Sequence, residues 1–174
     1  MKILVTYFSQ TGNTRQIAVA IHTEMAKQHD CELKELEQIL PEDLKNYNMI
    51  VVGSPIHAGG LAAQVKAFLD SLPDDPGFAM AAFITHAASV YDTAGFDKGV
   101  KALETAADQK RIQFKGLFSC QGRLTPELHD FVKASKKLSD EEWEKRKAEF
   151  NRHPNAEDEE RASVFARKII EEAS

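Results

Sequence analysis

The sequence predicts an α/β fold, a doubly wound five-stranded parallel sheet with helices on both faces. Three observations lead to this prediction. Short apolar runs alternate five times with segments of helical spacing. Residues 49–53 are continuously apolar, as in a parallel strand covered on both faces. An amphipathic segment at residues 156–173 supplies the closing helix. We therefore expect one domain over residues 1–174, with a helical insertion at about residues 123–154 before the last helix.

The elements follow from local pattern. Short apolar or alternating runs bounded by turn residues predict strands, and they lie at residues 2–8, 31–36, 49–53, 78–85 and 114–120. Apolar residues at helical spacing predict helices at residues 14–28, 61–72, 95–111 and 156–173. Residues 41–47 are expected to form a short helix or turn, and residues 54–60 and 85–92 to form loops. The strands therefore end beside three polar or glycine-containing segments.

The insertion has helix signals of its own. Thr125-Pro126 is typical of a cap followed by Pro at the first helical position. Ser139 with Glu142 resembles a capping box, and Asn155 is the expected cap of the last helix. Two interpretations stay open. The insertion is either a solvated helical pair or a lid or docking surface near the site. In the first case, four side chains would hold it on the domain: Phe131, Leu138, Trp143 and Phe150.

Composition narrows the function. The chain is 43% apolar and 28% charged, with a formal net charge of −5. That charge argues against a nucleic-acid binder, which needs a basic surface. No apolar run approaches the roughly 20 residues of a membrane span, and the first residues lack the features of a signal peptide. We expect a cytoplasmic protein without a membrane span, and free thiols at Cys31 and Cys120.

The stretch SQTGNT, residues 9–14, is the strongest candidate for a binding site. It lies between a strand and a helix, where unpaired N–H groups and the helix dipole favour a phosphate. Its hydroxyl and amide side chains can donate to an anion as well. The same residue types also favour the start of any helix, so the local chemistry alone leaves a plain N-cap cluster equally open.

Two further loops are expected at the same edge of the sheet, where ligands bind in open parallel sheets. Residues 54–60 combine Pro55 and His57 with Gly59 and Gly60. The two glycines allow close approach of a ring-sized ligand, although they also suit a plain turn. Residues 85–92 carry His86 and offer Tyr91 as a flat apolar surface.

Other site classes are excluded by missing patterns. The first loop has neither the G-x-x-x-x-G-K-[ST] motif of nucleotide-hydrolysing proteins nor the G-x-G-x-x-G motif of dinucleotide-binding domains. His57 and His86 have no Ser or Cys with the context of a catalytic triad, and the six histidines lack metal-like spacing. No metal site or catalytic residue is predicted.

With these residues in view, the chain resembles the flavodoxins. Tyr7-Phe8 followed by SQTGNT is similar to their FMN-phosphate loop, T/S-x-T-G-N-T. Residues 50–56 resemble their second loop, and residues 83–95 stand in the place of the third. The resemblance covers residues 1–122 and the last helix. It implies strand order 2-1-3-4-5, FMN as the cofactor, and redox proteins as partners.

The resemblance also implies roles for individual residues. The first loop would hold the FMN phosphate through Ser9, Gln10, Thr11, Gly12, Asn13 and Thr14. One side of the isoalloxazine ring would be lined by Pro55, Ile56, His57, Ala58, Gly59 and Gly60. The other side would be lined by Thr85, His86, Ala87, Ala88 and Tyr91. Ile56 and His57 stand where many flavodoxins place a large aromatic residue.

Three functional hypotheses follow. The first is a low-potential electron carrier, because the first loop contains no lysine to neutralise the phosphate. The second is an FMN-dependent reductase that passes hydride from NAD(P)H to a quinone or another acceptor. His57, His86 and the insertion with Trp143 motivate it. The third is an interaction module without flavin, against which the intact first loop argues.

Overall fold

A parallel sheet forms the centre of the molecule. The structure is a computed structural model and describes residues 1–57, 59–87 and 93–173. The sheet order is β2-β1-β3-β5-β6. Its strands are β1 (Lys2–Tyr7), β2 (Asp30–Glu35), β3 (Met49–His57), β5 (Ala79–His86) and β6 (Phe114–Gln121). Counted along the chain, these five strands have the order 2-1-3-4-5, which confirms the predicted fold class.

Strand β1 lies between β2 and β3, and its parallel pairing sets the register of the sheet. Val5 pairs with Leu33 of β2 on one side and with Val51 of β3 on the other. Strand β3 is buried from Met49 to Ser54, whereas β2 at the sheet edge is only partly buried. This difference explains why the sequence of β3 is continuously apolar and that of β2 alternates.

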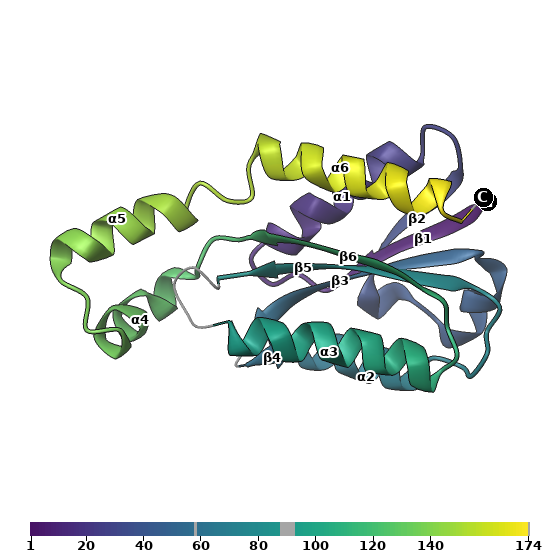
Figure 1. Cartoon of the computed structure of the whole chain (residues 1–174), viewed down its shortest axis with the longest axis horizontal. Helices are drawn as coiled ribbons and strands as arrows, with labels where there is room; N and C mark the ends of the chain where they lie inside the picture. Colours follow the sequence, from purple (N-terminus) through teal and green to yellow (C-terminus); the bar gives the residue numbers. More distant parts are fainter. Residues whose placement is uncertain (58, 88–92, 174) are drawn as a thin grey trace.

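Helices cover both faces of the sheet (Figure 1). Helices α1 (Asn13–Met25) and α6 (Ala156–Glu171) pack together on one face. Helices α2 (Ala63–Ser71) and α3 (Ala94–Gln109) cover the other. Alternate residues of β1 point to opposite faces, so Ile3 and Val5 belong to the α1–α6 core and Leu4 to the α2–α3 core. The connection from β2 to β3 contains two 3₁₀ turns, Leu36–Gln38 and Pro41–Asn46.

One predicted loop is wrong in part. Residues 54–60 were expected to leave the sheet, but β3 continues to His57 and pairs antiparallel with a short strand, β4 (Gly60–Leu61). Ile56 lies opposite Leu61, so the pairing of β3 continues past its last parallel pair, Pro55 with Thr85. Gly59 has φ 92°, a conformation that side chains with a Cβ rarely adopt. Helix α2 therefore begins at Ala63 instead of residue 61.

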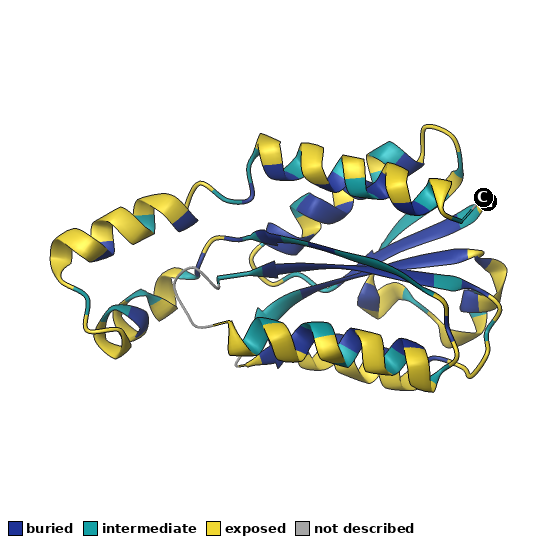
Figure 2. Cartoon of the chain, viewed as in Figure 1, coloured by how far each residue is buried: buried dark blue, intermediate teal, exposed yellow. Residues whose placement is uncertain are grey.

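The insertion extends beyond the ends of the strands as two helices (Figure 1). They are α4 (His129–Ser135) and α5 (Asp140–Phe150), preceded by a 3₁₀ turn at Pro126–Leu128. Most residues of α5 are exposed (Figure 2). Two of the three predicted caps are confirmed, because Ser139 and Glu142 form a capping box and the Asn155 side chain accepts from the first turn of α6. Thr125 stands before Pro126 at the start of the 3₁₀ turn, but its side chain makes no cap hydrogen bond.

The insertion has a small core of its own. Leu124, Val132, Trp143 and Phe150 are buried together, and Leu138 packs against them. The expected anchoring role of Phe131 is wrong, since 64% of this residue is exposed. Its neighbour Val132 is fully buried instead, because the next position of α4 is the one that faces the cluster. Within the described residues, no helix is both long and apolar enough to cross a membrane.

Candidate functional site

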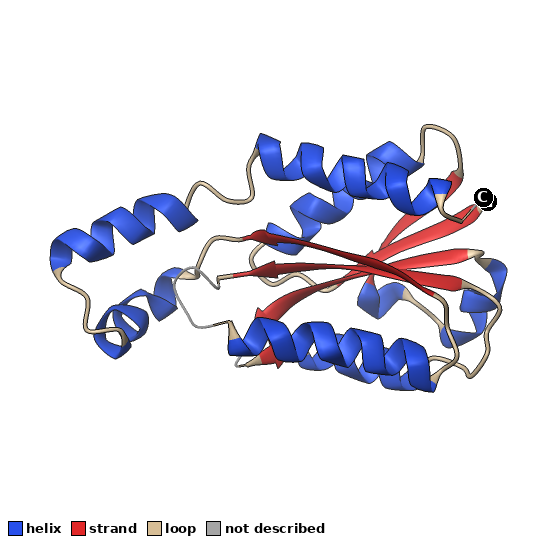
Figure 3. Cartoon of the chain, viewed as in Figure 1, coloured by secondary structure: helices blue, strands red, loops and turns tan. Residues whose placement is uncertain are grey.

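The carboxyl ends of the strands open into a cavity of about 610 Å³. Figure 3 shows that β3, β5 and β6 end on the same side, where loops gather and the insertion begins. A cavity of this volume falls in the range of small-molecule sites. All three predicted segments contribute to its lining, through Gln10, Thr11, Asn13, Pro55, Ile56, His57, Gly59, Thr85, His86 and Ala87. Four predicted residues lie outside this lining: Ser9, Gly12, Thr14 and Gly60. The predictions for Ala58, Ala88 and Tyr91 fall outside the described residues.

The first loop is folded by its own residues. Gly12 has φ 86° and stands directly before α1, and residues with a Cβ rarely adopt this conformation. The Ser9 Oγ atom accepts hydrogen bonds from the backbone N–H groups of Gly12, at 3.2 Å, and Arg15, at 3.3 Å. Ser9 therefore holds the turn from behind, and its role is to shape the loop.

The loop leaves several donors available. Within the described residues, the backbone N–H groups of Gln10, Thr11, Asn13 and Thr14 have no hydrogen-bond acceptor. They lie at the N-terminal end of α1, where the helix dipole adds positive potential. This donor set fits a phosphate group, which supplies several acceptor oxygens.

Asn13 connects the first loop to the end of β6. Its Nδ2 donates to Thr11 Oγ1 at 3.2 Å and to the carbonyl oxygen of Arg123 at 2.8 Å. Its Oδ1 is buried and has no hydrogen-bond partner in the described structure. Gly122 makes this packing possible, because a Cβ there would lie 2.8 Å from Asn13 Nδ2.

Thr14 and Thr85 connect the first loop to the end of β5. Their hydroxyl oxygens are 2.9 Å apart, and both residues are buried. The Thr14 side chain is therefore occupied inside the protein. Its backbone N–H remains the group that could reach a phosphate.

The other end of the cavity is apolar and contains rings. His86 packs against Phe96 with ring centroids 5.0 Å apart, and His57 packs against Phe8 at 6.1 Å. Burial lowers the pKa of both histidines below the usual value, which keeps both rings neutral at pH 7. Helix α3 approaches closely here, since a Cβ at Gly95 would lie 3.0 Å from the Cα of Gly59.

Sequence reasoning missed a further part of the lining. It comes from the start of α3, from the residue after β6 and from the insertion: Gly95, Phe96, Gly122, Arg123, Leu124, Thr125, Leu128 and Phe131. Gly122 and Arg123 could have been found, because they follow the fifth strand at the same sheet edge as the predicted loops. Arg123 matters most, since it brings a cation to a site that was expected to be neutral.

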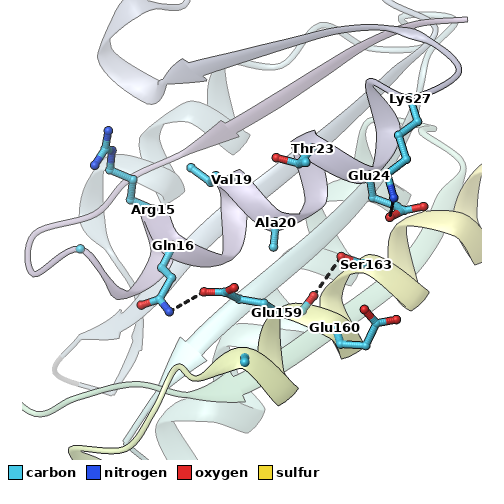
Figure 4. Close-up of a pocket in the computed structure, with 12 residues that line it drawn as sticks. Arg15, Gln16, Val19, Ala20, Thr23, Glu24, Lys27, Glu159, Glu160 and Ser163 are labelled. Atoms are coloured by element: carbon cyan, nitrogen blue, oxygen red, sulfur yellow. Dashed lines mark hydrogen bonds and ion pairs between the residues drawn. The ribbon is translucent and has the colours of Figure 1, made fainter.

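A second hollow, of about 580 Å³, lies between α1 and α6 (Figure 4). Gln16 and Glu159 point toward one another across it, with Nε2 and Oε1 2.7 Å apart. Glu24 is paired with Lys27 at 2.6 Å and with Arg167 at 3.1 Å. This hollow runs along the outside of the helices and its polar groups largely satisfy one another. The cavity at the strand ends is therefore the candidate site.

Neither cysteine lines the cavity at the strand ends. Cys31 and Cys120 are free thiols, and Cys120 is buried. Burial raises the pKa of each thiol to about 12, so both stay protonated at pH 7. A protonated thiol is a poor nucleophile, which gives the cysteines a packing role.

Comparison with known proteins identifies the family. A family model described as a flavodoxin domain matches residues 4–167. The flavodoxin-like domain-containing protein BilS of Clostridioides difficile is 28% identical over 100% of this chain and 99% of its own length. Oxidised flavodoxin 2 of Bacillus cereus matches with a TM-score of 0.71 and 24% identity over 99% of both chains. A Fusobacterium nucleatum flavodoxin bound to flavin mononucleotide matches with a TM-score of 0.64 and 12% identity over 98% of both chains. The chain belongs to the flavodoxin domain family.

Proposed function

We propose that the protein binds FMN in the cavity at the strand ends and transfers electrons between redox partner proteins. The observation that carries this proposal is the row of available N–H donors in the first loop, next to an apolar cavity. Family membership and the FMN-bound relative support the same cofactor. When bound, FMN supplies redox chemistry that the side chains of the cavity cannot perform.

One end of the cavity would bind the phosphate, and the other would surround the flavin ring. The N–H groups of residues 10–14 would hold the phosphate. Ile56 and Phe96 would exclude water around the ring, and the neutral His57 and His86 would line it without adding charge. Excluding water strengthens the electrostatic effect of every remaining charge, so Arg123 and the phosphate would together set the local potential.

Gly12 gives a direct test of the phosphate loop. Gly12→Ala places a Cβ on a residue with φ 86°, which costs about 1–2 kcal/mol or displaces the adjacent N–H groups. We expect the Kd for FMN to rise about tenfold, and the Kd for riboflavin, which has no phosphate, to stay within about twofold. The measurement is a titration of flavin-free protein, followed by quenching of flavin fluorescence.

Gly77→Ala is the matched control. Gly77 has φ 80° and, like Gly12, has no atom within 4 Å of a Cβ built on it. It lies outside the cavity lining, so its variant should bear the same strain and bind FMN as the wild type does. A wild-type chain that takes up no FMN would overturn the proposal and favour a flavin-free interaction module.

An FMN-dependent NAD(P)H:acceptor reductase is the second candidate function. It is favoured by the wall that the insertion adds to the cavity, because an electron carrier needs only an exposed cofactor edge. Steady-state kinetics separate the two candidates. Oxidation of NAD(P)H by the FMN-loaded protein alone, with a quinone as acceptor, would identify a reductase. If the FMN-loaded protein is reduced only by a separate partner protein, it is a carrier.

A further inference from the structure

Helix α4 and the residue before it carry apolar side chains on two sides. Val132 is fully buried and packs with Trp143 and Phe150 inside the insertion. Leu128, at the end of the 3₁₀ turn, and Phe131 are 41% and 64% exposed and line the cavity. Their spacing of three residues places them next to each other on one side. One face therefore holds the insertion together, and the other is left open toward the cavity.

The open face is concave rather than a flat surface patch. Single exposed apolar residues are common on proteins, but these two stand together in the wall of a cavity that also contains Ile56 and Phe96. Concave apolar sites with a few polar groups are typical of small-molecule binding. The geometry thus favours a small ligand over a protein surface.

The chemistry of this wall indicates which ligand fits. Among the described lining residues, Arg123 has the only charged side chain. Its Nη2 lies 3.5 Å from Gln16 Oε1, and its carbonyl accepts from Asn13, so it belongs to the phosphate-loop end. Phe131, His57 and His86 supply rings to the same lining, and burial lowers the pKa of both histidines, which favours their neutral form. Flat, uncharged rings pack best against such groups.

The open face is also additional to the predicted cofactor site. The three segments expected to hold FMN lie within residues 1–122, at the ends of the strands. Helix α4 lies beyond those ends (Figure 1), and its residue Phe131 lines the cavity. A molecule on Leu128 and Phe131 would therefore lie between the insertion and the cofactor.

We propose that Leu128 and Phe131 form the wall of a second binding site, which takes an uncharged, planar aromatic molecule beside the FMN. This inference rests on the proposed function, because the second site is completed by the cofactor. It assigns to the insertion a direct role in ligand selection.

Calorimetric titration of the FMN-loaded full chain with 2-naphthol tests the proposal. Wild-type protein should bind 2-naphthol, and it should bind decahydro-2-naphthol, which has the same skeleton without planarity, at least several-fold more weakly. Phe131→Ala should raise the Kd for 2-naphthol about tenfold, and Phe131→Leu should have a smaller effect because it keeps the apolar contact and loses only the ring. Phe131 is largely exposed, so neither change removes a core contact.

Val164→Ala is the control, because Val164 is 51% exposed on α6 and lies outside the cavity lining. It should leave the Kd for 2-naphthol unchanged. Absence of 2-naphthol binding, or equal binding by wild type and Phe131→Ala, would overturn the inference. If Phe131→Ala weakens FMN and 2-naphthol by the same factor, the wall belongs to the cofactor site and the inference is wrong, while the proposed function stands. A chain that fails to bind FMN in a separate titration removes both.

Discussion

At the scale of single residues, Arg123 shows how a position outside every motif can alter a site. The first loop contains no lysine, which predicted a phosphate held only by neutral donors. The turn after β6 nevertheless brings Arg123 to the same cavity, fixed through its carbonyl by Asn13. No local pattern indicates this contact, because it joins residues 110 positions apart in the chain. The contact can be predicted only from the fact that Arg123 follows β6 at the same edge of the sheet as the first loop.

Replacing Arg123 should therefore weaken FMN binding selectively. We expect Arg123→Gln to raise the Kd for FMN about two- to fivefold, since an exposed charge pair contributes up to about 1 kcal/mol. The difference should shrink at high salt, and riboflavin binding should not change. Fluorescence titrations at two salt concentrations measure both effects. Arg152→Gln removes the same charge from the exposed end of the insertion and should bind like wild type. Equal loss of FMN and riboflavin affinity would contradict a contact with the phosphate.

Glu32 should make the stability of the fold depend on pH, because its carboxylate is bonded to Lys2, Lys34 and Tyr47. Hydrogen bonds from Lys34, Tyr47 and Lys2 lower the pKa of Glu32 to about 2. A carboxylate with a lowered folded-state pKa stabilises the protein above its unfolded value, near 4.5, and loses that contribution as pH falls toward 2. Glu32→Gln should thus reduce the free energy of unfolding at pH 7 by up to about 1 kcal/mol, since the cluster is partly exposed.

The difference between wild type and Glu32→Gln should narrow when the urea unfolding experiment is repeated at lower pH, between about 4.5 and 2. Glu104→Gln, on the exposed side of α3, is the control and should show no such trend. A difference that stays constant over this pH range would show that the carboxylate charge does not stabilise the fold.

At the scale of elements, prediction succeeded where the signal is local. The capping box of Ser139 and Glu142 and the cap at Asn155 depend on residues three apart, and the structure has both. The β3–β4 hairpin was missed because its strength comes from pairing Ile56 with Leu61 across Gly59, and glycine-rich segments equally suit an open loop. The error in Phe131 has a similar origin. The α4 sequence places apolar residues at both 131 and 132, and only the position of α5 decides which one is buried.

Trp143 should stabilise the insertion without affecting the stability of the sheet. It is 6% exposed and packs against Phe150 and the His129 ring, at 5.9 and 5.4 Å between centroids. Trp143→Ala should remove about 3 kcal/mol of packing from this small cluster. Hydrogen exchange should then become faster in α4 and α5, while the amides of β1 and β3 stay protected. Phe131→Ala, at the exposed position of the same segment, should leave exchange unchanged. Faster exchange in β1 would show that the insertion and the sheet unfold as one unit.

At the scale of the whole molecule, the sequence predicted the sheet and its covering helices, but it did not predict how the insertion sits on them. Parallel strands with apolar helices have few alternative arrangements, so the strand order followed from the resemblance and the alternation. The insertion lacks such constraints. Its cluster contacts Ala87, which follows β5 and lines the candidate site. Residue patterns do not indicate that contact, which is why the sequence left two interpretations of the insertion open.

This arrangement makes the insertion separable from the fold, which we propose is one domain over residues 1–174. The two large cores contain no described residue from 123 to 154. Replacing residues 124–152 with a short Gly-Ser linker retains Arg123 and also His153, whose Nδ1 lies 2.6 Å from the buried Asp158 carboxylate. The shortened chain should unfold cooperatively in urea and bind FMN within about tenfold of wild type, because the phosphate loop is intact. It should no longer bind 2-naphthol. Loss of cooperative unfolding would mean that the sheet needs the insertion to fold. Retained 2-naphthol binding would mean that the ring site lies on the sheet and not on α4.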